Sequence, residues 1–345
     1  MIPPAAATGR LTMIANAMAR EIVLGKGGKA EAVSYVDKTT GSEQRVYAKA
    51  IVLAASACES ARLLLNSRSS SFPNGLANSS GDVGRHLTDS VGSDLAGYFT
   101  QLEKIPIHNH DGVGGMHMYM PWWRFGKKNG FLRGYHIEFG GGRDMPGVGG
   151  FDYVCHEHEG YGVSLKQKCR SSYGTFIGFS GRGEMIPNER SFCEIDPEVK
   201  DKWGIPVLRF HWEWGENEVK MAADMQETFR SIIETAGGTV IAGTRRHPQR
   251  SSSGASTVRP TAGRISQGGE IIHELGTIRM GNDPKTSALN RNCQAHDVRN
   301  VFVADAAPFV TNPDKNPTLT IMALAWRTSE YLLEQAKKGE LQDHG

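Results

Sequence analysis

The sequence predicts an α/β protein in which an open-sheet unit is interrupted by an antiparallel-sheet unit. Two buried strands are predicted, near residues 50–55 and 301–304, each leading through a loop of small or polar residues into a helix. Between them lies a long stretch rich in glycine and aromatic residues, with the alternation and turns of an antiparallel sheet. Strand–turn–helix units are typical of open sheets that bind a cofactor, whereas the middle stretch indicates a second domain.

Composition limits the class of protein. The chain has 345 residues, which is enough for about two domains. Lysine plus arginine number 39 and aspartate plus glutamate 37, and the net charge of +2 excludes nucleic acid or an anionic membrane as the main partner. No stretch approaches the roughly 20 apolar residues of a membrane-spanning helix. The five cysteines form no CxxC pair, so they indicate neither a disulfide framework nor a zinc site.

The first block covers about residues 8–95. Its first apolar residues have helical spacing and predict a helix through Leu11, Ile14, Met18 and Ile22. Strands are predicted next over residues 31–36 and 45–52, and the second of them continues into the buried stretch. A helix at residues 59–66 follows the small-residue turn.

The other two blocks continue the pattern. Residues 96–262 predict an antiparallel sheet with one clear helix at 216–236. Residues 263–345 return to α/β, with a strand at 301–304 and a long helix that begins near Asn316 and ends near residue 335. We therefore expect residues 1–95 and 263–345 to form one discontinuous domain, and 96–262 to form a second.

Two patterns are open to more than one interpretation. Gly25 to Ala30 fits the letters of a GxGxxG/A dinucleotide fingerprint, but a strand follows it where the fingerprint needs a helix, so we predict a hairpin turn. Four histidines in two His-x-His pairs have side chains suited to a metal, and they leave a metal-dependent hydrolase as an alternative: His108, His110, His156 and His158.

The most specific signal lies near the end of the chain. His273-Glu-Leu-Gly-Thr, the stretch from His296 to Ala307 and the stretch from Asn316 to Ala325 follow one another in order. These segments, with residues 50–65 and 78–85, resemble the C-terminal portion of the glucose–methanol–choline (GMC) family of FAD-dependent oxidoreductases, near the bacterial gluconate and glucoside dehydrogenases. The resemblance implies a Rossmann-like FAD-binding domain at residues 1–95 and 263–345, interrupted by a substrate-binding domain at 96–262.

The resemblance also implies roles for individual residues. His273 lies beside the flavin and removes the hydroxyl proton while hydride passes to flavin N5, a task that suits the pKa of an imidazole. Asn316 is implied as the second catalytic residue, although asparagine before Pro317 is also a favoured helix N-cap, and both interpretations stay open. The implied contacts to the cofactor come from Ser56, Ala57, Asp305, Ala306, Pro317, Thr318 and Ala19.

Members of the family begin with a strand–GxGxxG–helix unit, which the resemblance does not include here. We expect the chain to be a fragment, a truncated reading frame or one half of a two-chain arrangement, and to bind FAD poorly by itself. Its implied partners are a sugar or polyol, an N-terminal half and an electron-transfer protein. Its location, cytoplasmic or periplasmic, depends on the N-terminal part.

The predicted function is oxidation of a hydroxyl group of a sugar, glycoside or polyol, by a dehydrogenase or oxidase. Tryptophans that would stack on a pyranose ring support a sugar: Trp122, Trp123, Trp212 and Trp214. A catalytically inactive carbohydrate-binding or interaction module is the alternative from another class, and bound flavin distinguishes it from an enzyme.

Overall fold

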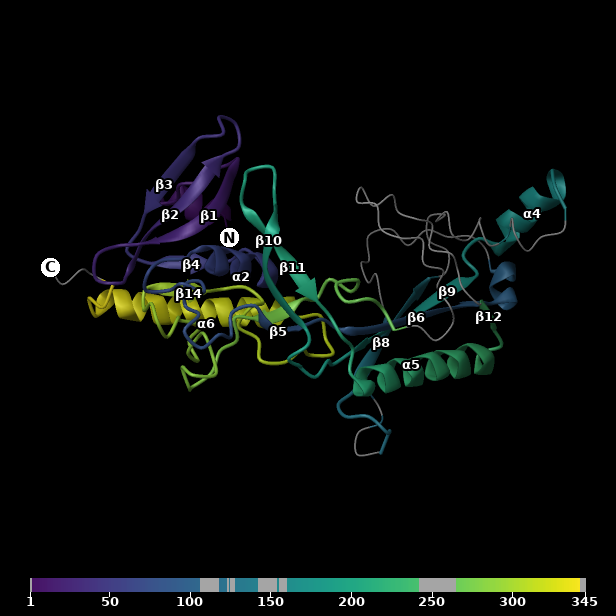
Figure 1. Cartoon of the computed structure of the whole chain (residues 1–345). Coiled ribbons are helices and arrows are strands. Elements are labelled where there is room, and N and C mark those ends of the chain that lie inside the picture. Colours follow the sequence, from purple (N-terminus) through teal and green to yellow (C-terminus); the bar gives the residue numbers. More distant parts are fainter. Residues whose placement is uncertain are drawn as a thin grey trace.

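A computed structural model describes residues 2–105, 118–122, 124, 128–141, 154, 160–241 and 265–341. Figure 1 shows two groups of elements side by side, the first built from both ends of the chain and the second from its middle. Each group has its own hydrophobic core. The predicted α/β class with an antiparallel sheet is confirmed.

A parallel pair of short strands, β4 (Ile51–Leu53) and β14 (Val301–Val303), lies in the first group. Helix α2 (Ala57–Asn66) follows β4 and buries its leucines in the core. Next to it, β5 (Arg85–Thr88) pairs antiparallel with β13 (Leu275–Thr277). Both pairs join residues from opposite ends of the sequence, and together they bring the predicted site segments into one place.

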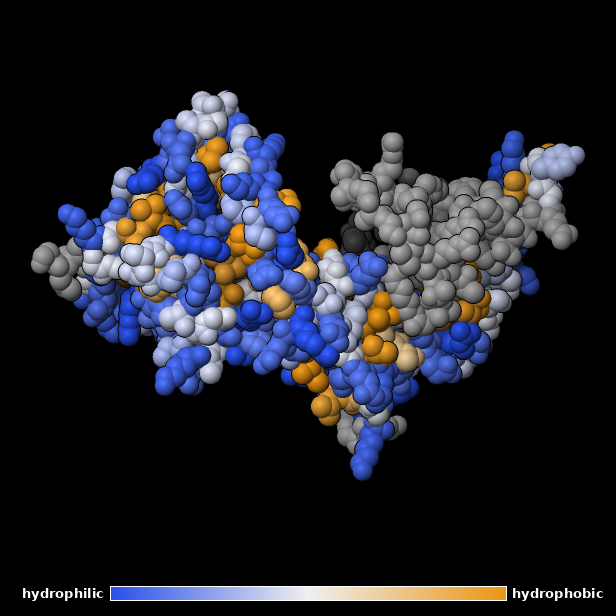
Figure 2. Space-filling view, in the orientation of Figure 1, coloured by the Kyte–Doolittle hydropathy of each residue, from blue (hydrophilic) through white to orange (hydrophobic). Residues whose placement is uncertain are grey.

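A three-stranded antiparallel sheet packs beside α2. It consists of β1 (Ala17–Leu24), β2 (Ala30–Asp37) and β3 (Glu43–Tyr47), in that order. The predicted hairpin is confirmed, because the GxGxxA segment lies between β1 and β2 and its turn places Gly27 and Gly28 at φ values of +89° and +77°. Figure 2 shows hydrophobic side chains interrupting a largely hydrophilic surface over this sheet.

Two predictions for this part of the chain are wrong. The segment predicted as a helix instead forms β1, in which Ile22 pairs with Val33, whereas Leu11 and Ile14 lie before it and are 41% and 49% exposed. Pairing with β2 satisfies the backbone N–H and C=O groups of this segment, so the helical spacing of its apolar residues does not decide its conformation. The strand predicted over residues 45–52 is two strands, β3 and β4, which belong to different sheets.

The second group contains a five-stranded antiparallel sheet in the order β12-β6-β9-β8-β7. Its strands are β6 (Val91–Tyr98), β7 (Met118–Met120), β8 (Tyr135–Gly141), β9 (Phe176–Gly183) and β12 (Thr239–Ile241). The antiparallel sheet predicted for the middle of the chain is confirmed. The described residues also include three short helices: α1 (Ile2–Ala7), the 3₁₀ helix η1 (Thr100–Lys104) and α4 (Val163–Ser172).

Helix α5 (Glu216–Thr235) covers one face of this sheet, within one or two residues of its predicted bounds. Its Met221 and Met225 are fully buried against β9. A Cβ at Gly181 would lie 2.4 Å from the Met225 sulfur, and one at Gly183 would lie 2.4 Å from the Met221 sulfur. The odd-numbered residues of this part of β9 therefore face α5, and the even-numbered residues face away from it.

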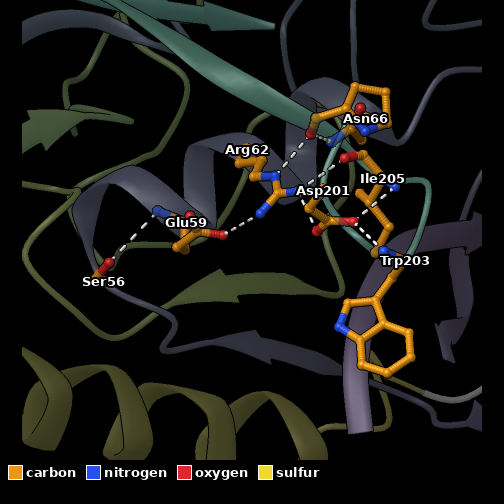
Figure 3. Close-up of polar contacts among 8 residues, drawn as sticks. Ser56, Glu59, Arg62, Asn66, Asp201, Trp203 and Ile205 are labelled. Atoms are coloured by element: carbon orange, nitrogen blue, oxygen red, sulfur yellow. Dashed lines mark hydrogen bonds and ion pairs between the residues drawn. The ribbon is translucent and has the colours of Figure 1, made fainter. Parts of the chain in front are cut away.

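The hairpin of β10 (Phe192–Lys200) and β11 (Pro206–His211) packs against α2. Arg62 of α2, with a side chain only 9% exposed, reaches into the loop of this hairpin (Figure 3). Its guanidinium donates to the Pro206 carbonyl at 2.8 Å, to the Ile205 carbonyl at 3.1 Å and to the Asp201 carboxylate at 2.8 Å. Arg62 thus holds the hairpin against the helix, together with Asn66, whose carboxamide donates to the same Pro206 carbonyl at 3.2 Å.

Helix α6 (Thr318–Lys337) ends the described chain, close to the predicted bounds. The predicted cap by Asn316 is wrong, because Pro317 precedes the first helical residue and no side chain caps the helix. The α6 side chains Leu319, Met322 and Trp326 are 78%, 53% and 69% exposed and lie on one stripe. In the described part of the chain, no helix is both long and apolar enough to cross a membrane.

Candidate active site

The carboxyl ends of β4 and β14 meet at one edge, which is where open α/β sheets bind ligands. Ser56 follows β4 and caps α2 in a left-handed conformation (φ +85°), which is strained for a residue with a side chain. Asp305 follows β14, and its carboxylate accepts hydrogen bonds from the Ser60 hydroxyl at 2.5 Å and the Ala307 N–H at 2.8 Å. Burial raises the pKa of Asp305 despite these bonds.

The segment of residues 273–278 lies against both of these strand ends. The Thr277 hydroxyl donates to the Ala57 carbonyl at 2.6 Å, and the Gly276 N–H donates to the Ala306 carbonyl at 3.2 Å. Gly276 has a φ of +81°, and a Cβ there would lie 2.3 Å from the His86 carbonyl oxygen, so only glycine fits. The fold therefore brings four predicted cofactor-contact residues into the neighbourhood of His273: Ser56, Ala57, Asp305 and Ala306.

His273 is held by three neighbours. Its backbone N–H donates to the Asp89 carboxylate at 3.0 Å, and its carbonyl accepts from the Asn312 carboxamide at 3.4 Å. The Ser90 hydroxyl lies 3.1 Å from ring atom Nδ1. Within the described residues, no hydrogen bond occupies Nε2. The imidazole is thus oriented from one side, and Nε2 is the nitrogen available to a substrate.

The surroundings of His273 favour its neutral form. Burial lowers the pKa of His273 below its ordinary value, the charges of Arg182 and His136 lower it further, and Glu138 opposes them. A neutral imidazole is the form that accepts a proton. Burial also raises the pKa of Asp89 to about 6, although the N–H groups of His273, Ser90 and Gly269 all donate to its carboxylate.

Polar side chains line the face of the five-stranded sheet that is turned away from α5. His136 and Glu138 alternate along β8 with buried residues of the core, and Arg182 lies opposite His136 on β9. The His136 Nε2 lies 3.2 Å from the Glu138 carboxylate, and the Arg182 Nε lies 3.9 Å from the same carboxylate. Burial disfavours a charge on His136, but the carboxylates of Asp314 and Glu138 outweigh it and raise the pKa of His136.

The loop between β14 and α6 connects this face to His273. Asn312 bonds the His273 carbonyl, and Asp314 lies 3.7 Å from His136 Nδ1. Asn316, Pro317 and Thr318 come next, at the uncapped start of α6. The predicted adenine contact, Ala19, lies elsewhere, exposed on β1.

The sequence interpretation missed the residues that surround His273. Asp89 and Ser90 are two polar residues between strands, and Asn312 lies in a loop, so none of the three stands out from ordinary turn residues. His136 and Glu138 did carry a signal. They alternate with Tyr135, Ile137 and Phe139, a period of two that places both polar side chains on one face of a strand.

Two other predictions concern the tryptophans expected to stack on a sugar and the histidines expected to bind a metal. Trp122 is buried in the core, with its ring 4.8 Å from that of Tyr135, so it does not offer a face to a sugar. Trp212 and Trp214 pack edge to face at 5.0 Å. The remaining tryptophan and the proposed metal ligands lie outside the described residues: Trp123, His108, His110, His156 and His158. Among the residues that are described, no cluster of three metal-ligating side chains occurs.

Sequence comparison gives a consistent set of relatives. Residues 1–91 and 187–325 match the sequence models of GMC oxidoreductases. The chain is 30% identical over 312 residues to a 2-methyl-1,2-propanediol dehydrogenase of Mycolicibacterium austroafricanum, covering 89% of the chain and 52% of the relative. It is 26% identical over 327 residues to the large subunit of a fructose dehydrogenase of Gluconobacter japonicus, covering 95% of the chain and 55% of the relative. The chain thus spans about half the length of these relatives.

Solved structures share the fold. A pyridoxine 4-oxidase of Mesorbium loti superposes with a TM-score of 0.53 at 17% identity, over 95% of the chain and 60% of that structure. A formate oxidase of Aspergillus oryzae superposes with a TM-score of 0.58 at 13% identity, over 94% of the chain and 61% of that structure. At these identities the likeness concerns the fold alone.

Proposed function

Because the chain belongs to the GMC oxidoreductase family, whose proteins bind FAD, we propose that it oxidises a hydroxyl group of a sugar or polyol with His273 as the base. The observation that carries this proposal is the setting of His273. Asp89 and Ser90 fix its backbone and its ring, and burial with a nearby guanidinium keeps it neutral. A general base needs a fixed geometry and must be unprotonated at the working pH.

The residues at the strand ends fit the flavin end of the cofactor. The turn at Ser56 is strained, and the start of α6 presents first-turn N–H groups that no side chain caps. Uncapped N–H groups at a helix N-terminus favour an electron-rich group, here the reduced flavin. We propose that Ser56, Ala57, Asp305 and Ala306 contact FAD, with Pro317 and Thr318 approaching it through their backbone.

The GxGxxA segment does not provide a site for the phosphate end of FAD. The GxGxxA segment forms a hairpin turn, and strand β2 follows it directly. A pyrophosphate is held by the N–H groups of a helix N-terminus, which this turn does not supply. We propose that a further polypeptide segment holds the pyrophosphate in the working enzyme, and that an electron-transfer protein or oxygen takes the electrons afterwards.

The proposed chemistry divides between the cofactor and the protein. Bound FAD would accept a hydride from the carbon that carries the hydroxyl group. His273 Nε2 accepts the hydroxyl proton, and the loss of that proton and a hydride leaves a carbonyl product. Ser90 holds Nδ1, so the ring keeps its orientation when its charge changes. Asn316, which does not cap α6, is proposed to hold the substrate hydroxyl toward His273.

The relatives support the substrate class. Two of them are named as dehydrogenases of 2-methyl-1,2-propanediol and fructose, compounds that carry more than one hydroxyl group. We propose a sugar, a glycoside or a polyol as the substrate of this chain.

Steady-state turnover of a polyol by the FAD-loaded enzyme tests the role of His273. We expect His273→Ala to lower turnover by on the order of 10² to 10⁴, the usual share of a positioned general base. His211→Ala is the matched control, because His211 pairs with Glu194 at 2.9 Å on the β10–β11 hairpin and is not part of the proposed site. Near-normal turnover by His273→Ala would remove the proposed base.

A further inference from the structure

Two buried polar atoms beside His273 lack a hydrogen-bond partner among the described residues. They are Nδ1 of His136 and Oδ1 of Asn312, both in side chains with no exposed surface. The nearest carboxylate oxygen to Nδ1, from Asp314, is 3.7 Å away, which is longer than a hydrogen bond. A buried polar atom without a partner costs free energy, so such atoms in a site point to a missing ligand group.

The His136 atom belongs to a polar surface formed by one face of the five-stranded sheet. Pairing across the sheet places His136 beside Arg182, and Glu138 beside Ser180 and then Asp94. Ser180 donates to Asp94, and the Arg182 guanidinium lies 3.8 Å from Asp94 and 3.9 Å from Glu138. All of these side chains are on the face turned away from α5. Carboxylates and a guanidinium side by side form hydrogen bonds in pairs, which suits adjacent hydroxyl groups.

The loop that ends at Asn316 joins this surface to the reacting position. Asn312 contacts the His273 carbonyl, and Asp314 lies next to His136. A hydroxyl group that reacts at His273 would therefore place the neighbouring carbons of the same molecule over the sheet. A hydroxyl both donates and accepts, so it satisfies the Asn312 oxygen and the His136 nitrogen in either protonation state of the imidazole.

We propose that His136, Glu138 and Arg182, with Asn312, form a subsite that binds the hydroxyl groups next to the one that reacts. The subsite selects a compound with at least two neighbouring hydroxyl groups over a monohydric alcohol. This inference rests on the proposed function, because it takes His273 as the position of the reacting hydroxyl. It adds the residues that bind the rest of the substrate.

Binding to the full chain tests the subsite without any turnover. Saturation-transfer NMR detects weak ligands, and the two probes are D-glucose and 2-propanol. We expect the wild-type chain to bind D-glucose and not 2-propanol. His136→Gln is expected to weaken D-glucose binding about tenfold to a hundredfold, the usual effect of leaving polar partners unpaired in a site. His211→Gln is the control, because it alters an exposed His–Glu pair on the β10–β11 hairpin, outside the proposed subsite.

A second variant distinguishes loss of the subsite from loss of the fold. Arg182→Lys keeps the charge but loses the planar fork, and it too should weaken D-glucose binding while the thermal midpoint stays near that of the wild type. Equal binding of the two probes, no binding of D-glucose by the wild type, or unchanged binding in both folded variants would overturn the inference. Binding that depends on His136 and Arg182 in a chain that never oxidises a polyol would support the subsite and reject the proposed function.

Discussion

At the scale of single residues, the neutral state of His273 determines how the reaction depends on pH. Burial and the charge of Arg182 lower the pKa of His273 below its ordinary value of 6.5. The base form is present above this pKa and is lost as the pH falls through it. We therefore predict that kcat/KM is constant at neutral pH and declines only below pH 6.5. A pH profile of kcat/KM with its acid limb centred above 6.5 would contradict the assignment.

The raised pKa of Asp89 makes the stability of the folded chain depend on pH. Burial raises its pKa from 3.8 to about 6, so between these values the folded chain binds more protons than the unfolded chain. This contribution to the free energy of unfolding grows as the pH falls from about 6 toward 4, and it is absent above pH 6. Its size is at most about 2–3 kcal/mol.

The variant Asp89→Asn has no charge to bury, so we expect it to lose this pH-dependent increment. Urea unfolding of both proteins at several pH values between about 4 and 6 gives the free energy of unfolding of each, and the two slopes with pH are compared. Parallel curves for the wild type and Asp89→Asn would show that Asp89 titrates normally.

The sequence could single out His273 and the strand-end residues as candidates because each belongs to a segment with recognisable neighbours. It could not identify Asp89, Ser90 or Asn312, because hydroxyl, carboxylate and amide groups are common in turns, and only the fold brings these three to His273. Residues that act through contacts distant in sequence leave no local pattern.

At the scale of elements, Arg62 is the main link between α2 and the β10–β11 hairpin. Its side chain is 9% exposed, and removing it takes a charged donor from the Asp201 carboxylate and from two backbone carbonyls, all of which keep other donors. We predict that Arg62→Ala lowers the free energy of unfolding by about 2–3 kcal/mol. Chemical denaturation measures this change.

The comparison is Arg20→Ala, because Arg20 and Glu43 form a 2.9 Å ion pair in which both side chains are more than 40% exposed. That pair should contribute no more than about 1 kcal/mol. Equal losses in the two variants would mean that the Arg62 contacts do not hold the hairpin.

Elements with a long apolar period or a continuous apolar run were predictable. Helices α2, α5 and α6 and strand β14 lie close to where the sequence placed them. Strand β1 was not predictable in this way, because four apolar residues fit a helical spacing by chance and pairing with β2 decided the outcome. Local pattern gives way to sheet pairing when a neighbouring strand satisfies the backbone.

At the scale of the whole molecule, the two hydrophobic cores suggest how the chain is divided. The first core includes Leu64 and Val301, from opposite ends of the sequence, whereas the second uses the middle of the chain. We propose that the first unit holds FAD and the second holds the substrate. The hairpin of β10 and β11 belongs to the middle of the sequence, yet its Cys193 is part of the first core.

The hairpin at the GxGxxA segment has a consequence for cofactor affinity. Without a helix N-terminus after that turn, the pyrophosphate of FAD gains no backbone cradle there. We predict that the 345-residue chain binds FAD weakly, with a dissociation constant above about 1 µM, which corresponds to about 8 kcal/mol of binding free energy. A fluorescence titration of FAD with the purified chain gives this constant, and submicromolar binding would contradict the prediction.

The most direct test of the account is whether a polyol reduces FAD through this chain. The measurement is anaerobic bleaching of FAD absorbance after a polyol is added, with the cofactor in large excess so that weak binding does not limit occupancy. The account predicts bleaching that depends on the chain and saturates with the polyol. It also predicts that bleaching slows by on the order of 10² or more in His273→Ala but not in His211→Ala. Bleaching that is equally fast in His273→Ala, or absent at every concentration of FAD and polyol, would contradict it.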